Sequence, residues 1–204
     1  NNSISFLIIN LLEKYFVKKC NYIICLTSDA KQHLSQYIDT KKIHVIPTCA
    51  DTSKYTFLNN KENKNNKINL CYMGSTSKAY NFQKIIKIFS SLYNIDKNYN
   101  LFIFTNNQYS HIIDEIKKNN LNKKKIIFKN LNSDQIIDEL KHIDYGFFFL
   151  NCNFSVKATF PTKIAEYLSL GIPLICNNFN NDISQLINNN KIGYVYNNQS
   201  VYEL

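Results

Sequence analysis

The sequence contains no arginine, although 24 lysines against 15 acidic residues give it a formal net charge of +9. Arginine supplies the bidentate contacts to guanine and phosphate that lysine makes poorly. The lysines are also spread along the chain rather than gathered in one block. The composition therefore weighs against a nucleic-acid binder. The positive charge fits solvated faces or contact with an anionic membrane surface.

The sequence also lacks a run of about 18 apolar residues, the length that suggests a membrane span. The apolar stretch at residues 4–12 is too short, and no basic region before it or cleavage site after it marks a signal peptide. We therefore expect a cytoplasmic protein, with peripheral contact at the inner face of the membrane. Because the chain starts with Asn rather than Met, we expect it to be a piece of a longer protein.

Metal-binding patterns are missing too. The six cysteines form no Cys-x-x-Cys pair, and four of them lie in or beside apolar runs, which predicts reduced core residues. There is no Asp-x-Asp motif, and the histidines lack ligand spacing with the cysteines. We expect no metal and no tightly bound cofactor. We assign structural or surface roles to the four histidines, which are His33, His44, His111 and His142.

What the sequence does contain is a regular alternation of short apolar runs and helical patterns. Before residue 47 we predict helices at 3–20 and 27–38 and strands at 22–26 and 43–46, and the polar stretch 48–66 reads as a linker. After the linker we predict strands at 68–73, 101–105, 125–129, 145–150, 172–176 and 193–196, with a helix between each pair. Strands that are apolar throughout are buried on both faces, which predicts an α/β fold with a parallel, helix-covered, Rossmann-like sheet. Such sheets bind ligands at the carboxyl ends of their strands.

Two loops at those ends could carry chemistry. The run Gly74-Ser75-Thr76-Ser77 follows the first strand after the linker, and its small residues would let backbone N–H groups approach a phosphate. The alternative is an ordinary turn between a strand and a helix.

The second loop leads into the helix predicted at 161–170. Pro161 suits the first helical position, and the free N–H groups of the first turn favour an anion. Thr162 adds a hydroxyl and Lys163 a positive charge, which together suit a diphosphate. Glu166, one turn on, could accept hydrogen bonds from two ribose hydroxyls. The alternative is that Lys163 and Glu166 form an i,i+3 surface ion pair.

The stretch 155–175, with Pro-Thr-Lys, Glu-Tyr-Leu and Gly-x-Pro in that order, resembles the nucleotide-sugar signature of retaining GT-B glycosyltransferases of the E-x7-E type. It is most similar to bacterial surface-polysaccharide members. Three other segments agree in order: residues 43–51 are similar to the segment between the two domains, residues 70–75 to the first strand and loop of the donor domain, and Asp182 to an Asp after a later strand.

The resemblance implies two facing Rossmann-like domains. Residues 1–50 would be the end of the N-terminal acceptor domain, 51–66 the linker, and 67–204 the donor domain without its final helices. Glu166 matches the second Glu of E-x7-E, which holds the ribose, whereas Ala158 stands in place of the first. Lys157 or Ser155 could substitute for that missing group. Base contacts are expected from the backbone at residues 129–131.

The resemblance implies a glycosyltransferase that moves a sugar from a nucleotide-sugar to a glycan or lipid-linked acceptor. The expected donor-binding residues are Gly74, Ser75, Lys157, Thr162, Lys163 and Glu166, with Lys163 also catalytic because it would stabilise the leaving diphosphate. The alternatives are a non-catalytic nucleotide-sugar-binding module, another sugar-nucleotide enzyme such as an epimerase, and a lysine-rich nucleic-acid binder.

Overall fold

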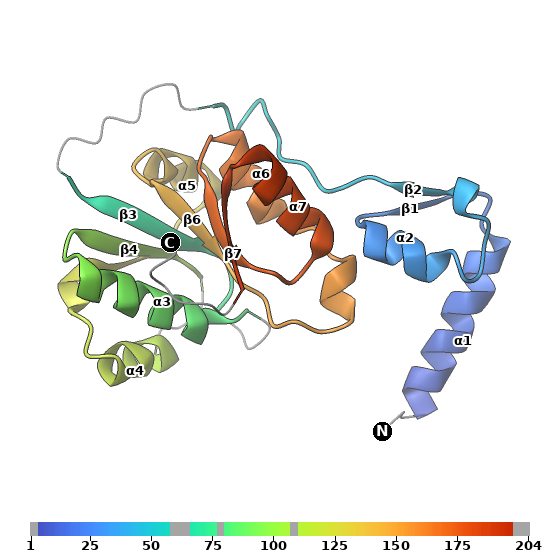
Figure 1. Ribbon diagram of the computed structural model, residues 1–204, viewed down its shortest axis with the longest axis horizontal. Helices are drawn as coiled ribbons and strands as arrows, with labels where there is room; N and C mark the ends of the chain where they lie inside the picture. The colour runs from blue at the N-terminus through green and yellow to red at the C-terminus, as the bar shows by residue number, and fades with distance from the viewer. Residues whose placement is uncertain (1–3, 58–65, 77–79, 107–109, 198–204) are drawn as a thin grey trace.

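The computed structural model describes residues 4–57, 66–76, 80–106 and 110–197. These residues form a two-stranded and a six-stranded sheet, both parallel (Figure 1). The predicted α/β class with a Rossmann-like parallel sheet is confirmed. Ser77, which the sequence groups with Gly74, lies outside the described residues, as does the side chain of His111.

The six-stranded sheet has the strand order β5-β4-β3-β6-β7-β8. The chain starts in the middle at β3, builds outward to β5, and then returns to the other side of β3 with β6. Ligand sites of doubly wound sheets lie beyond the carboxyl ends of the strands at such a reversal. The strands are β3 (Ile68–Met73), β4 (Tyr99–Phe104), β5 (Ile126–Lys129), β6 (Tyr145–Phe148), β7 (Leu174–Asn177) and β8 (Gly193–Tyr196).

Helices cover both faces of this sheet (Figure 1). Successive side chains of a strand point to opposite faces, so Leu70 and Tyr72 enter one apolar cluster while Cys71 and Met73 enter the other. The first cluster is closed by α3 (Phe82–Ile95) and α4 (Ser110–Lys118). The second is closed by α5 (Ser133–Leu140), α6 (Thr162–Ser169) and α7 (Asn181–Asn190). The double burial explains why the strands are apolar throughout.

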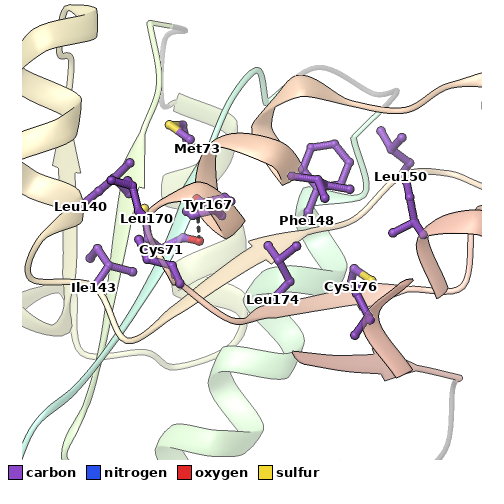
Figure 2. Close-up of a cluster of buried hydrophobic side chains, with 14 of the residues drawn as sticks. Cys71, Met73, Leu140, Ile143, Phe148, Leu150, Tyr167, Leu170, Leu174 and Cys176 are labelled. Atoms are coloured by element: carbon purple, nitrogen blue, oxygen red, sulfur yellow. Dashed lines mark hydrogen bonds between the residues drawn. The ribbon is translucent and has the colours of Figure 1, made fainter. Parts of the chain in front are cut away.

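Tyr167 fixes α6 to the centre of the sheet. Its hydroxyl donates a hydrogen bond of 3.1 Å to the carbonyl oxygen of Cys71 on β3, as the dashed line in Figure 2 shows. Its ring lies against Gly146 on β6, where an added Cβ would stand 2.9 Å from ring carbons. Tyr167 is fully buried, so this contact sets the position of the helix that carries Lys163 and Glu166.

The N-terminal unit, residues 4–45, forms α1 (Ile4–Lys19), β1 (Ile23–Cys25), α2 (Ser28–Leu34), the short 3-10 helix η1 (Thr40–Lys42) and β2 (Ile43–Val45). It meets the larger sheet unit through the start of α2 (Figure 1). There the Thr27 hydroxyl donates to the carbonyl oxygen of Lys157 at 2.9 Å, and the Ser28 N–H donates to Asp182 at 2.6 Å. The two units are therefore in direct contact.

Several predicted strands begin or end one or two residues away from the predicted position, as β4 (Tyr99–Phe104) does, and two of these differences have a local cause. The strand predicted at 145–150 ends at Phe148, because the side-chain amide of Asn177 bonds both the N–H and the carbonyl oxygen of Leu150 in place of a neighbouring strand. The strand predicted at 172–176 begins at Leu174, since Pro173 has no N–H to donate to a ladder. The helix predicted at 27–38 ends at Leu34.

Candidate functional site

A cavity of about 290 Å³ opens at the carboxyl ends of β3 and β4, beside the start of α6. It brings together Gly74, Ser75 and Lys163, three of the residues predicted from sequence to bind the same ligand. Its remaining lining is Met73, Phe104, Thr105, Asn106, Leu131 and Ile136. The cavity thus combines an apolar wall with polar groups and one cation, as small-molecule sites do.

The turn after β3 forms one side of the cavity. Gly74 has a φ of +148°, a region that L side chains rarely adopt, which explains the glycine. Its N–H donates to the carbonyl oxygen of Phe104 at 3.0 Å, and the carbonyl oxygen of Ser75 accepts a hydrogen bond from the Tyr72 hydroxyl. The backbone of the turn is therefore held at two points.

The first turn of α6 contributes Lys163 to the same cavity. Pro161 occupies the N-cap rather than the first helical position predicted from sequence, because its ψ of 131° is extended; Thr162 is the first helical residue. Pro161 has no N–H and no side chain that could accept a hydrogen bond from the first turn. Thr162 is exposed and is not among the residues that line the cavity, whereas Lys163 is.

Lys163 and Glu166 form the i,i+3 ion pair that the sequence left open as an alternative. The lysine Nζ lies 2.9 Å and 3.2 Å from the two carboxylate oxygens. This pair is not a fully exposed one, since the Glu166 side chain is only 12% exposed and that of Lys163 is 34% exposed. Glu166 itself does not line the cavity, but it pairs with Lys163, which does.

Tyr55, from the predicted linker, is a second partner of Glu166. Burial, followed by the charge of Glu166 and a hydrogen bond with it, raises the pKa of Tyr55 to about 12. Tyr55 therefore stays protonated at neutral pH and can donate to the carboxylate. No pattern in the sequence predicts this contact, because a tyrosine within a polar stretch carries no periodic signal. Neither Thr105 nor Asn106 is named as a site residue from sequence, although Thr105 ends a predicted strand and Asn106 begins the loop at the predicted edge of the sheet.

Lys157 lies apart from Lys163 in the structure. It belongs to the short 3-10 helix η3 (Ser155–Ala158), and its side chain lines a second cavity of about 410 Å³ between η3 and the N-terminal unit. Ser155 and Ala158 line the same space, as does Asp29 of α2. The predicted role of Lys157 in donor binding stays a prediction.

The histidines whose side chains the structure describes lie outside the first cavity. His33 approaches Glu13 to 3.9 Å, and His44 and His142 are exposed. Over the described part of the chain, no three His, Cys, Asp or Glu side chains are grouped closely enough to hold a metal ion. Within the same part, no helix is both long and apolar enough to cross a bilayer.

Several solved structures share the fold. A glycosyltransferase from Rickettsia africae superposes with a TM-score of 0.71 at 18% identity, covering 94% of this chain and 54% of that one. The lipopolysaccharide outer core galactosyltransferase WaaB gives 0.69 at 14% identity, with 90% and 50% covered. A point mutant of TarM from S. aureus gives 0.67 at 16% identity, with 94% and 37% covered. The chain thus spans about half or less of the length of these proteins.

The family of the chain follows from its sequence. No curated protein sequence matches the chain. The sequence pattern of the family described as "Glycosyl transferases group 1" matches residues 54–204, which include the larger sheet and every residue that lines the cavity. Because this match extends over well more than half of the chain, the protein belongs to the glycosyl transferases group 1 family.

Proposed function

We propose that this chain is the donor-binding part of a glycosyltransferase, and that it takes a nucleoside diphosphate sugar as donor. The observation that carries the proposal is that Gly74, Ser75 and Lys163 line one cavity at the carboxyl edge of the sheet. A glycine turn and a helix N-terminus with a lysine suit a diphosphate from two sides.

The rest of the cavity suits a nucleoside. Met73, Phe104, Leu131 and Ile136 provide an apolar wall against which a base could lie. Leu131 belongs to the loop from which the sequence analysis expects base contacts. The structure of the TarM mutant contains UDP, which makes UDP the first nucleotide to test on this chain.

In the proposed reaction the bond between the anomeric carbon of the sugar and the diphosphate oxygen breaks, and a bond from that carbon to a hydroxyl oxygen of the acceptor forms. The hydroxyl proton passes to the departing diphosphate, on which negative charge grows as the bond breaks. Lys163 and the first-turn N–H groups of α6 would stabilise this charge from fixed positions. Loss of one such donor typically costs about 2.7–4 kcal/mol in the transition state. Thr162, one residue before Lys163, would contribute its N–H and hydroxyl.

Glu166 has two roles in this proposal. Without donor it neutralises Lys163. With donor bound, Lys163 turns to the diphosphate, and the carboxylate accepts hydrogen bonds from ribose hydroxyls while Tyr55 continues to hold it. A carboxylate offers about four lone-pair sites, enough for these partners together.

The proposed acceptor is a glycan or a lipid-linked glycan of a surface polysaccharide, and the proposed location is the cytoplasmic face of a membrane. The net charge of +9 supports peripheral contact with anionic lipid. WaaB is a galactosyltransferase of the lipopolysaccharide outer core, and its shared fold supports the same class of acceptor.

The test is a thermal-shift panel of UDP, GDP, CDP and ADP against the chain and its Glu166→Ala variant. Saturation at about 100 times the dissociation constant adds about 2.7 kcal/mol, or roughly 5–10 °C for a chain of this size. Glu115→Ala is the matched control, because Glu115 is similarly buried and forms an i,i+3 pair with Lys118 at 3.0 Å on α4. We expect one nucleotide to stabilise the chain and the control but not Glu166→Ala. No shift with any nucleotide in the folded chain would contradict the proposal.

A non-catalytic nucleotide-sugar-binding module is the second candidate, favoured by Ala158 at the position of the first Glu of E-x7-E. It predicts the same nucleotide shift without turnover. Release of nucleoside diphosphate from the matching nucleotide-sugar, measured with the full-length protein, separates the two. Release that is absent in a Lys163→Ala variant supports the enzyme, and no release above background supports the module.

A further inference from the structure

The second cavity, of about 410 Å³, lies between η3 and the N-terminal unit. Polar side chains line it from α2 and the turn that follows α2, namely Asp29, Gln32, His33 and Gln36, and Glu13 of α1 joins them. Residues three and four positions apart share one face of a helix, so this spacing gathers the polar groups on one side of the segment. The volume lies within the range of small-molecule sites, which is about 300–1,000 Å³.

Hydrogen bonds to the main chain hold the walls of this cavity together. The Thr27 hydroxyl, at the start of α2, donates to the carbonyl oxygen of Lys157 on η3 at 2.9 Å. The Asn180 amide donates to the same oxygen, also at 2.9 Å. The Ser28 N–H donates to the Asp182 carboxylate on α7 at 2.6 Å. The cavity is therefore formed before any ligand arrives, as small-molecule sites usually are.

The charges of the lining disfavour a phosphate and suit a neutral ligand. Among the described residues that line the cavity, the carboxylates of Glu13 and Asp29 outnumber the single ammonium of Lys157. The carboxylates accept hydrogen bonds, the ammonium donates them, and the amides of Gln32 and Gln36 do both. A sugar residue suits this set of groups, because its hydroxyls both donate and accept and it carries no charge.

Phe154 adds an apolar surface to the same cavity. Its side chain is 72% exposed. The ring is oriented by His33, with centroids 5.3 Å apart and planes at 78°, and His33 in turn packs against Tyr37 at 5.7 Å. The C–H groups on one face of a sugar ring carry partial positive charge, which the negative face of an aromatic ring attracts. An oriented aromatic ring beside carboxylates and amides therefore matches both surfaces of a sugar.

We propose that the second cavity binds a sugar residue of the acceptor glycan. Asp29 and the two glutamine amides bond to its hydroxyls, and Phe154 packs against its C–H face. Lys157 then serves the acceptor rather than the diphosphate of the donor. This assignment rests on the proposed function, since the proposed reaction is what requires a glycan acceptor.

The test measures the dissociation constants of methyl glycosides by titration in saturation-transfer NMR. The probes are the methyl glycosides of glucose, galactose, mannose and N-acetylglucosamine, and the proteins are the chain, Asp29→Ala and Phe154→Ala. We expect at least one glycoside to bind the chain saturably, and to bind Asp29→Ala about tenfold more weakly because hydrogen bonds to a charged group are lost. Phe154→Ala should weaken binding about fivefold through the lost apolar contact. Because Phe154 is 72% exposed, this variant should fold normally.

Asp134→Ala is the matched control, because Asp134, like Asp29, is an acid in the first turn of a short helix, but on α5. We expect it to bind the glycoside as the unaltered chain does. Saturating UDP, or whichever nucleotide stabilises the chain, should leave the glycoside affinity unchanged, since it occupies the other cavity.

Three results would overturn this inference while leaving the donor site in place: no saturable binding of any of the four glycosides, an affinity that neither cavity variant lowers, or displacement of the glycoside by nucleotide. Glycoside binding by a chain that binds no nucleotide would instead support the sugar site and contradict the proposed function.

Discussion

At the scale of single residues, Glu166 is more constrained than its sequence position implies. A glutamate three residues after a lysine on a helix predicts an exposed pair of small energetic value. Here the carboxylate is 12% exposed and is also held by Tyr55, which comes from before the first strand of the larger sheet. A carboxylate fixed from two sides is oriented before a ligand arrives. This arrangement suits a ligand-binding carboxylate better than one that only forms an ion pair on the surface.

The cysteines give a prediction at this scale. Burial raises the pKa values of Cys71 and Cys176 to about 12, so their reactive thiolate forms are nearly absent at pH 8. We expect iodoacetamide at pH 8 to label the exposed thiols first and these two only after unfolding, as followed by peptide mass spectrometry. The exposed thiols are those of Cys20, Cys49 and Cys152.

Denaturant provides the control, since all six cysteines should then react at similar rates. Labelling of Cys71 in the native chain as fast as that of Cys152 would contradict the buried assignment.

At the scale of elements, a single side-chain amide connects two segments near the site. Asn180 is 2% exposed, and its Nδ2 donates to the carbonyl oxygens of Lys157 and Thr159, at 2.9 Å and 3.0 Å, on the segment leading to α6. Its Oδ1 accepts from the Ile183 N–H and caps α7. Asn180 thereby keeps η3 and the start of α7 in contact.

We therefore expect Asn180→Ala to lower the free energy of unfolding by about 2–4 kcal/mol, because it removes a helix cap and leaves buried carbonyl oxygens with fewer partners. Asn180→Ser should be milder, since serine can still cap the helix. Urea denaturation measures both variants. Equal losses in the two would mean that the bonds to Lys157 and Thr159 dominate and the cap contributes little.

Element positions were largely predictable, and the differences have local causes. The strands and helices of the larger sheet lie close to the predicted positions. Strands buried on both faces give continuous apolar runs, and helices buried on one face give apolar residues at helical spacing. The early end of β6 depends on the Asn177 amide, which replaces a strand partner at Leu150. The N-cap position of Pro161 depends on its ψ, which composition does not encode.

At the scale of the whole molecule, buried thiols and a buried tyrosine with raised pKa values make the free energy of unfolding depend on pH in the alkaline range. The folded chain keeps protons on Cys71 and Cys176 up to about pH 12, whereas ordinary thiols lose them near 9.0. Tyr55 likewise titrates at about 12 instead of 10.0. Each raised pKa stabilises the folded state fully below the unfolded value, and this contribution is lost as pH rises toward the folded value.

We thus expect these groups to leave the urea concentration at the unfolding midpoint unchanged between pH 7 and 8.5. From about pH 9 upward the midpoint should fall steadily. A Cys71→Ala, Cys176→Ala double variant should be less stable throughout, with a shallower decline between pH 9 and 10, where ordinary thiols titrate before ordinary tyrosines do. A midpoint that stayed constant to pH 11 in the unaltered chain would contradict the buried protonated state.

The sequence by itself determined the α/β class, the order of the elements and the residues at the carboxyl ends of the strands. These properties depend on hydrophobic period, on glycine and proline, and on caps, all of which are local. It thereby predicted Gly74, Ser75 and Lys163, which the structure brings together in one cavity.

Only the tertiary structure decided which of these side chains meet. It joined Tyr55 to Glu166, put Tyr72 beneath Ser75, and left Lys157 in a different cavity from Lys163. Such contacts join residues from separate loops and elements, and they follow from strand order, side-chain direction and the path of irregular segments. None of these properties produces a periodic pattern in the sequence, because the role of a loop residue depends on the partner that it contacts in the folded chain.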